Sequence, residues 1–228
     1  MRFFVITMLA SLSLFANDVK LVSNPVTEEL ILTIRDPNTN RIDFRGALET
    51  LGELLALEIT KDMPTITKDV KTCMNATATQ LVRDKNEKIV VVTILRAGLP
   101  TFNGIMKIFK EAEAGFFGMK RDEITKEARM FYVAIPPLEN KTVIIADTMV
   151  ATGGSILEAI KIIEKQKPKK IIIAGVISAQ YAIDRISRYN KDVIFYTTAL
   201  DPKLDSRAYI VPGLGDAGDR CFGEKKDD

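Results

Sequence analysis

The stretch from Thr142 to Ser155 constrains the fold of this chain more than any other part of the sequence. It opens with a short, mostly β-branched apolar run, residues 143–146, which is typical of a strand buried on both faces. A loop of small residues follows, and apolar residues then recur at helical spacing from Ile156 to Ile163. A strand, a glycine loop and a helix N-terminus in this order favour a phosphate site, because backbone amides and the helix dipole attract an anion.

One acidic residue in this stretch, Asp147, stands where we expect the strand to end. A carboxylate repels phosphate, so it suits sugar hydroxyls or a bound metal ion instead. The stretch therefore indicates a sugar phosphate rather than a bare phosphate. No Gly-Lys-Ser or Gly-Lys-Thr closes the loop, which excludes a Walker motif. An ordinary strand-to-helix turn, with glycine for tight geometry, is the alternative interpretation.

Strand and helix patterns alternate through the second half of the chain. We expect strands at 89–95, 171–178 and 193–199 and a helix at 182–189. This alternation predicts an α/β fold with a mainly parallel sheet flanked by helices on both faces.

The first half of the chain carries two amphipathic helical patterns, at 25–35 and 44–55. The second of these is expected to pack against the core or against a partner subunit. Between it and the first strong strand lies a Thr-rich, weakly periodic stretch, residues 63–84, which reads as short strands or loop.

The length of 228 residues suits one α/β domain with modest additions, and we expect a single domain over residues 17–228. Residues 1–16 form an N-terminal extension that looks like a short secretory signal peptide, since Arg2 precedes an apolar stretch that ends near Ala16. The alternatives are a buried N-terminal segment and an upstream start codon that is not used, with Met8 internal.

Composition excludes several classes of chemistry. The chain contains no histidine, which removes Ser-His-Asp and Cys-His hydrolysis and most zinc sites. A net charge of +2 gives no reason to expect a nucleic-acid surface. Two cysteines, Cys73 and Cys221, make no disulfide framework and read as reduced and structural. Any chemistry must therefore use carboxylates, Lys, Arg, Tyr, backbone amides or a hard metal ion.

Arg96 directly follows the strand at 89–95, at the position where open α/β sheets bind ligands. Ala97-Gly98 after it allow a ligand or a backbone to come close. Further along, a strand at 115–119 and an extended stretch at 130–135 flank charged residues. This polar hairpin is either a solvated excursion or a mobile flap over the site.

The C-terminal segment, residues 209–220, packs Gly213, Gly215 and Gly218 into six residues. Their spacing formally matches the dinucleotide fingerprint, but too few residues follow for the helix, strand and distal acid that this fingerprint requires. The segment instead offers backbone amides and carbonyls close to Asp216, which could read a planar base. A glycine-rich terminal loop without a ligand is the alternative.

Together these segments resemble the uracil phosphoribosyltransferase family, one of the type I phosphoribosyltransferases. Residues 209–220 look like its uracil-binding segment, and residues 94–99 and 118–121 resemble its arginine motifs. Residues 147–155, here named the central loop, resemble the phosphoribose loop shared by many related transferases. The resemblance covers residues 18–223 and implies a type I phosphoribosyltransferase fold with a flexible hairpin hood.

The resemblance implies transfer of phosphoribosyl from 5-phosphoribosyl 1-diphosphate to N1 of uracil, giving UMP and diphosphate in pyrimidine salvage. Asp216 and Arg121 would be catalytic. Mg²⁺ would be the cofactor, held through the diphosphate with Asp216 as a further contact and no other direct side-chain ligand. The diphosphate substrate would contact Arg96, Arg121, Asp147, Thr148, Met149, Val150, Ala151, Thr152, Gly153, Gly154, Ser155 and Asp216. Uracil would contact Ile210, Gly215, Asp216 and Ala217.

Three positions depart from the usual pattern of that family. Thr148 stands where proline is usual, which puts the geometry after Asp147 in doubt more than its role. Lys120 stands where tyrosine is frequent, and Pro100 is uncommon at the start of the helix that follows Arg96. None of the three removes a charged contact.

The resemblance also implies a homodimer or homotetramer, GTP binding and a cytoplasmic location, with no nucleic-acid or membrane partner. Because phosphoribosyl diphosphate is a cytosolic metabolite, it argues against a signal peptide at residues 1–16. One alternative is a regulatory protein on the same fold that senses a nucleotide and controls RNA or DNA; no helix-turn-helix or basic stripe supports it. The other is a sister transferase for hypoxanthine, orotate or cytosine.

Overall fold

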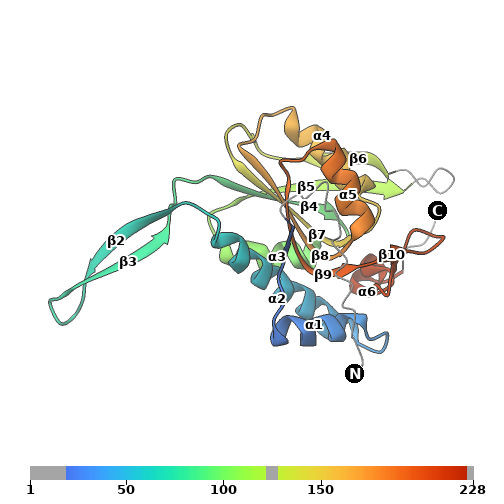
Figure 1. Ribbon diagram of the computed structural model, residues 1–228, viewed down its shortest axis with the longest axis horizontal. Helices are drawn as coiled ribbons and strands as arrows, with labels where there is room; N and C mark the ends of the chain where they lie inside the picture. Colours follow the sequence, from blue (N-terminus) through green and yellow to red (C-terminus); the bar gives the residue numbers. More distant parts are fainter. Residues whose placement is uncertain (1–18, 122–127, 225–228) are drawn as a thin grey trace, which may run out of the picture.

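A seven-stranded sheet forms the centre of the fold (Figure 1). The structure is a computed structural model that describes residues 19–121 and 128–224. The strand order is β1-β9-β8-β7-β4-β5-β6, and all neighbours are parallel except β5 and β6. The strands are β1 Val19–Leu21, β4 Ile89–Leu95, β5 Glu113–Arg121, β6 Ala128–Ala134, β7 Thr142–Val150, β8 Lys170–Ala179 and β9 Ile194–Asp201. The predicted α/β fold with a mainly parallel sheet is confirmed.

The central strands are buried along almost their whole length. β4 is buried from Ile89 to Ile94, and β8 is buried from Ile171 to Ala179. Val- and Ile-rich runs of this kind have no polar face, so both sides of the sheet need a covering layer.

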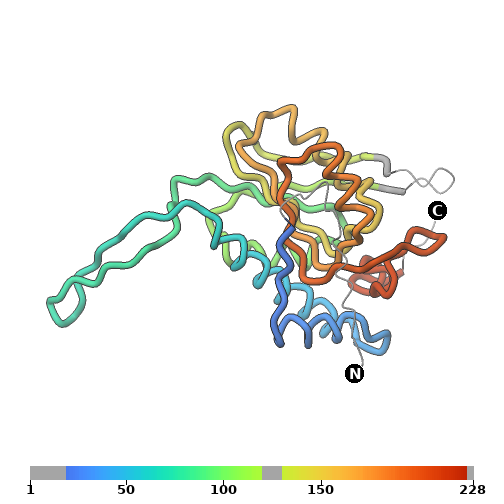
Figure 2. The backbone as a smooth tube through the Cα atoms, in the orientation of Figure 1, coloured from blue at the N-terminus to red at the C-terminus, as the bar shows by residue number. Residues whose placement is uncertain are grey.

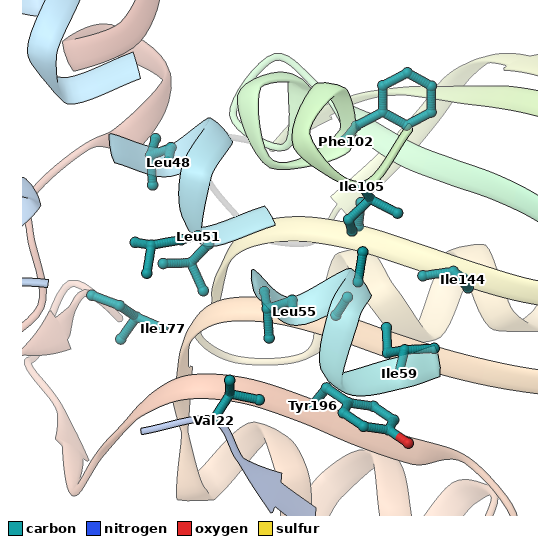
Figure 3. Packing of buried hydrophobic residues seen from close by; sticks show 14 of the residues in the cluster. Val22, Leu48, Leu51, Leu55, Ile59, Phe102, Ile105, Ile144, Ile177 and Tyr196 are labelled. Atoms are coloured by element: carbon teal, nitrogen blue, oxygen red, sulfur yellow. The ribbon is translucent and has the colours of Figure 1, made fainter. Parts of the chain in front are cut away.

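Helices supply that layer on both faces (Figure 1). One face is covered by α1 Pro25–Arg35, α2 Arg41–Thr60, α3 Leu99–Ile108 and α6 Ala217–Phe222, and the other by α4 Gly154–Glu164 and α5 Gln180–Tyr189. Figure 3 shows the first of these two cores, where side chains of α2 and α3 meet the sheet. The helices contribute Leu48, Leu51, Leu55, Ile59, Phe102 and Ile105, and the sheet contributes Ile144, Ile177 and Tyr196.

Side-chain caps set where the first two helices begin. Asn24 accepts hydrogen bonds from two backbone N–H groups of the first turn of α1, and Pro25 stands in that turn, where its missing N–H is not needed. Asn40 caps α2 in the same way. The bounds of α1 are those predicted, whereas α2 extends beyond the predicted 44–55 because its buried stripe continues to Ile59.

A two-stranded antiparallel hairpin extends away from the rest of the molecule (Figure 2). It consists of β2 Thr65–Lys71 and β3 Thr77–Arg83 and is named the arm. Every residue of β2 is exposed, and the register places Ile66 opposite Val82 and Val70 opposite Ala78 on one face. The stretch 63–84 therefore forms strands, as one of its two interpretations predicted, but strands outside the sheet.

The strand β7 runs past the end that the sequence predicted. Its ladder with β4 ends at Ala146, but its ladder with β8 continues to Val150, so Asp147 lies inside the strand. A second small pair, β10 Lys203–Leu204 and β11 Ile210–Val211, leads into the C-terminal helix.

The extension at residues 1–16 lies outside the described ranges. Across residues 19–121 and 128–224, no helix is both long and apolar enough to cross a membrane.

Candidate active site

Apart from Arg121, the predicted site residues come from three segments at the carboxyl edge of the sheet. Arg96 follows β4, the central loop leads from β7 into α4, and the C-terminal segment leads from β11 into α6. Because β4 and β7 are parallel neighbours, the first two segments lie side by side. Arg96 joins the third to them, since its Nη2 donates to Asp219 Oδ1 at 2.8 Å and its Nη1 donates to the carbonyl oxygen of Gly223 at 3.3 Å.

The central loop encloses a small cavity at the N-terminus of α4. The cavity measures about 50 Å³ and is lined by Asp147 and residues 149–156. Gly153 precedes the helix with a φ of +73°, a conformation that favours glycine, and the hydroxyl of Thr152 accepts the N–H of Gly154 at 3.3 Å. The first amides of a helix have no intrahelical partner, so the cavity offers donors to an anion.

Asp147 is the buried acid of this loop, with an exposed fraction of 8%. Its Oδ1 accepts the backbone N–H of Thr148 at 2.8 Å. Burial raises the pKa of Asp147 to about 7, because the carboxylate loses its hydration, and hydrogen bonds from the backbone of Thr148 and Met149 oppose this only in part. Near neutral pH the group therefore exists in both protonation states and can accept a hydrogen bond from a hydroxyl or donate one to it.

Thr148 connects the central loop to the loop that follows β4. Its side chain is fully buried; its Oγ1 donates to the carbonyl oxygen of Ala97 at 2.8 Å and lies 3.0 Å from Thr101 Oγ1. A proline here would supply neither this hydroxyl nor the N–H that Asp147 accepts. The residue that departs from the family pattern thus holds the acid through its backbone and the neighbouring loop through its side chain.

Glycine backbones shape the C-terminal segment. Gly213 and Gly215 have φ angles of +59° and +87°. A Cβ atom on Gly213 would lie 2.1 Å from the carbonyl oxygen of Ile210, so a side chain does not fit there. Ile210 and Ala217 are buried, and Gly215 is exposed between them. The segment therefore presents backbone atoms at its exposed turn.

Asp216 begins α6 and lies close to Arg96. Its Oδ1 accepts the backbone N–H of Asp219 at 2.9 Å, and the side chain of Asp219 binds Arg96. A Cβ atom on Gly218 would lie 3.2 Å from Asp216 Oδ1 and 3.8 Å from Arg96 Nη2. The carboxylate and the guanidinium therefore share the space beside one glycine.

Three side chains that sequence reasoning did not assign to the site anchor the C-terminal segment. Arg35 forms a two-point ion pair with Asp201, at 2.9 and 2.7 Å, and both partners bind the backbone of Gly213. Arg220 donates to the carbonyl oxygen of Leu214 at 2.8 Å and to the end of α1. No local signal marks the two arginines, because an arginine in the last turn of a helix ordinarily reads as dipole-stabilised charge. Asp201 was missed because the predicted strand at 193–199 ends before it.

Arg121 is the last residue of β5, and its side chain lies outside the described part of the chain, as do residues 122–127. The antiparallel pairing of β5 with β6 is present, with an irregular register between Gly118 and Met119. The catalytic role of Arg121 and the closing of the hood stay predictions.

The metal-ligand chemistry of the site consists of carboxylates. Over residues 19–121 and 128–224, no group of three or more His, Cys, Asp or Glu side chains could hold a metal ion. Mg²⁺ takes oxygen ligands and is commonly bound through one or two carboxylates together with substrate phosphates. The half-buried Asp216 therefore fits an ion that arrives with a diphosphate better than one held by the protein alone.

Comparison with known proteins places these segments in one family. A family model described as uracil phosphoribosyltransferase matches residues 21–224. The uracil phosphoribosyltransferase of Bacillus velezensis is 36% identical over 208 residues, which are 91% of this chain and 99% of that protein. The enzyme of the same name from a Geobacillus species is 38% identical over the same shares. A solved structure from Aquifex aeolicus superposes with a TM-score of 0.83 at 35% identity, covering 90% of this chain and 98% of that one.

Proposed function

The chain belongs to the uracil phosphoribosyltransferase family, and we propose that it acts as the family name says. It transfers the phosphoribosyl group of 5-phosphoribosyl 1-diphosphate to N1 of uracil, giving UMP and diphosphate in pyrimidine salvage. The observation that carries the proposal is Arg96, which follows β4 beside the central loop and binds α6 of the C-terminal segment at 2.8 Å. The segments proposed to bind the sugar phosphate, the diphosphate and the base therefore lie together at one edge of the sheet.

Phosphoribosyl diphosphate binds along the central loop. The amides of residues 151–155 receive the 5-phosphate at the start of α4, where the helix dipole favours an anion. Asp147 binds the ribose hydroxyls, and its elevated pKa suits a carboxyl that lies close to phosphates because it carries less than a full negative charge near pH 7. Arg96 binds the diphosphate as a cation that already lies beside this loop.

Uracil is read by the backbone of the C-terminal segment. Ile210, Gly215 and Ala217 supply amide and carbonyl groups, which match the donors and acceptors on the edge of a pyrimidine. Asp216 would contact both the base and the diphosphate substrate, and its position beside Gly218, next to the guanidinium of Arg96, supports this role. The segment thus holds the attacking nitrogen near the anomeric carbon.

The reaction requires no histidine. Displacement at the anomeric carbon passes through an oxocarbenium-like state, as glycosidic cleavage does. The protein therefore has to position the base and stabilise the departing diphosphate. The positive charges of Arg96 and Arg121 stabilise the diphosphate. A hood that excludes water would prevent loss of the sugar to hydrolysis.

Magnesium is the cofactor of this proposal. Bound to the diphosphate and contacted by Asp216, it would neutralise charge on the leaving group.

A uracil assay tests the proposal directly. Purified protein should convert labelled uracil to UMP only when phosphoribosyl diphosphate and Mg²⁺ are both present. Hypoxanthine, orotate and cytosine should not compete, and a salt-dependent mobility shift with nucleic acid should be absent. A folded sample that produces no UMP would refute the function.

Asp216→Asn is the sharpest variant for this assay, because asparagine retains the oxygen that caps α6 while it removes the charge. We expect activity to fall by at least about 1000-fold with an unchanged melting temperature, as for loss of a catalytic electrostatic contact. Asp192→Asn, at an exposed residue before β9, is the matched control and should retain full activity. An active Asp216→Asn enzyme would remove Asp216 from the mechanism while leaving the overall function intact.

We further infer that the protein assembles into a homodimer or a homotetramer through the arm. An isolated two-stranded hairpin is marginal in water, and this one exposes Ile66, Val70 and Leu81, with exposed fractions of 44, 59 and 70%. A second copy would cover these side chains. Val70→Lys should lower the mass measured by light scattering to that of the single chain; an unchanged mass would rule out the arm as the contact.

The proposed location follows from the substrate, and the proposed GTP binding follows from the family resemblance. We propose that the protein works in the cytoplasm, where phosphoribosyl diphosphate is made, and that it binds GTP. A sample that starts at residue 17 should match the full chain in the uracil assay, and equilibrium dialysis with labelled GTP should detect binding. Loss of activity on removal of residues 1–16 would assign those residues a structural role.

A further inference from the structure

We propose that Arg35 and Asp201 are positioning residues for uracil. They bind both polar groups of the Gly213 backbone and thereby hold the segment that recognises the base. The proposal rests on the function proposed above. Arg35 is the last residue of α1, and Asp201 is the last residue of β9. Their side chains are 20% and 5% exposed and pair through both carboxylate oxygens, at 2.9 and 2.7 Å. The pair is thus nearly removed from water and geometrically specific.

The ion pair binds one backbone unit as well as itself. The N–H of Gly213 donates to Asp201 Oδ2 at 2.9 Å, and Arg35 Nη1 donates to the carbonyl oxygen of Gly213 at 2.7 Å. Both polar groups of this glycine are therefore used by one acid and one base. Gly213 lies between Ile210 and Gly215, which supply the proposed contacts to uracil, so the pair determines where those contacts stand.

A second arginine also binds the backbone of this segment, at the residue that follows Gly213. Arg220 of α6 donates to the carbonyl oxygen of Leu214 at 2.8 Å and to that of Asp36 at 2.6 Å, just beyond α1. It also donates to Ile34 near the end of α1 and lies 4.0 Å from the ring centre of Phe44. The end of α1 is therefore tied to two consecutive residues of the C-terminal segment.

The central loop does not share these anchors. Among the hydrogen bonds of the described residues, none joins α1 to residues 147–155; that loop is bound through Ala97 and Thr101 and through Arg185 of α5. Disturbing the Arg35–Asp201 pair should therefore weaken uracil binding and leave phosphoribosyl diphosphate binding in place. A merely structural role would lower the fraction of active enzyme, which reduces kcat and leaves both KM values unchanged.

Steady-state kinetics with each substrate varied in turn tests the inference. Arg35→Met removes the guanidinium, and Asp201→Asn keeps the shape but removes the charge. We expect each to raise KM for uracil by roughly 10- to 100-fold, since a buried pair is broken and Gly213 loses a charged partner. KM for phosphoribosyl diphosphate should change by less than about threefold, because its site has separate hydrogen bonds.

Arg83→Met is the matched control. Arg83 is the last residue of β3; its side chain is 21% exposed and forms an ion pair with Glu111 at 3.2 Å, near the amino ends of β4 and β5. It should leave both KM values unchanged. Arg35→Lys keeps the charge without the two-point geometry and should give an intermediate KM for uracil; it also replaces Arg35→Met if that variant does not fold.

The outcomes separate the two proposals. A wild-type enzyme that makes UMP, with folded variants whose KM for uracil is unchanged, would overturn the positioning role alone. A parallel rise in both KM values would overturn it too. A wild-type protein without turnover would instead refute the proposed function.

Discussion

The central loop and the C-terminal segment lie at the same edge of the sheet, but they are held there by different means. The central loop continues β7 into α4, so the sheet and the helix position it directly, and Thr148 ties it to Ala97 nearby. The C-terminal segment has only the two-residue β11 and the short α6. It depends instead on charged side chains that come from α1, β9 and α6.

Binding of the two substrates therefore depends on different kinds of interaction. Phosphate binding uses geometry that any strand, glycine loop and helix provide. Base recognition requires the C-terminal segment, which has little secondary structure, to keep one conformation, and this depends on specific tertiary contacts. Changes at the two regions should therefore affect different kinetic constants: KM for phosphoribosyl diphosphate at the central loop and KM for uracil at the C-terminal segment.

The largest expected effect concerns the buried acid of the central loop. The pKa of Asp147 is about 7 in the folded protein against 3.8 for the free group. Between these values the folded state binds more protons than the unfolded state, so the free energy of unfolding falls as pH rises from about 4 to about 7. At about 1.36 kcal/mol per pKa unit, the loss approaches roughly 4 kcal/mol above pH 7.

Asp147→Asn should remove this pH dependence. Urea unfolding at pH 5 and pH 8 should show the variant gaining stability relative to wild type at the higher pH, while phosphoribosyl transfer drops. Asp192→Asn is the exposed control. An equal difference between wild type and Asp147→Asn at both pH values would show that the acid is not destabilised by its burial.

The next effect concerns Gly213. A Cβ atom there would lie 2.1 Å from the carbonyl oxygen of Ile210, in a backbone with φ of +59°. We expect Gly213→Ala to raise KM for uracil by about 100-fold, because a positive φ and a backbone clash together cost on the order of 3 kcal/mol. Gly46→Ala, in α2 with nothing within 4 Å of the new atom, should leave kinetics unchanged. A rise confined to KM for phosphoribosyl diphosphate would contradict the assignment of the C-terminal segment to uracil binding.

A smaller effect is expected where the two regions meet. Arg96 reaches Asp219 and Gly223 from the end of β4, so Arg96→Lys keeps the charge but cannot span both partners. We expect kcat/KM to fall roughly 10- to 30-fold for both substrates, since loss of a charge-assisted contact costs about 2 kcal/mol. Arg83→Lys serves as the control. An effect on one substrate only would show that Arg96 belongs to one region.

The smallest effect concerns Thr148. Thr148→Val deletes the hydroxyl that donates to Ala97 and leaves the partly buried carbonyl oxygen of Ala97 without that donor. We expect KM for phosphoribosyl diphosphate to rise about fivefold with KM for uracil unchanged, as for one buried hydrogen bond of about 1 kcal/mol. Thr148→Ser should restore the wild-type value. A Thr148→Ser enzyme as impaired as Thr148→Val would assign the effect to packing of the methyl group.

Much of the fold could be predicted because the signals for its strands and helices lie in contiguous residues. The apolar runs that became β4, β7, β8 and β9 have the length and β-branching of buried strands, and α1 has a proline start and a one-sided stripe. The arm was harder, since exposed Thr-rich strands have no core to impose a clear period. The end of β7 was also misjudged, because its last residues pair only with β8.

The strand, glycine loop and helix around the central loop could be identified from the residues alone, since each feature depends on neighbours a few positions away. The motif of the C-terminal segment was also readable, as a run of glycines around Asp216. The side chains that hold that segment are evident only in the folded molecule, because Arg35 lies 166 residues from Asp201 and 178 residues from Gly213. Periodicity predicts whether a side chain is buried, but the partner of a buried charge depends on which distant segments the fold brings together.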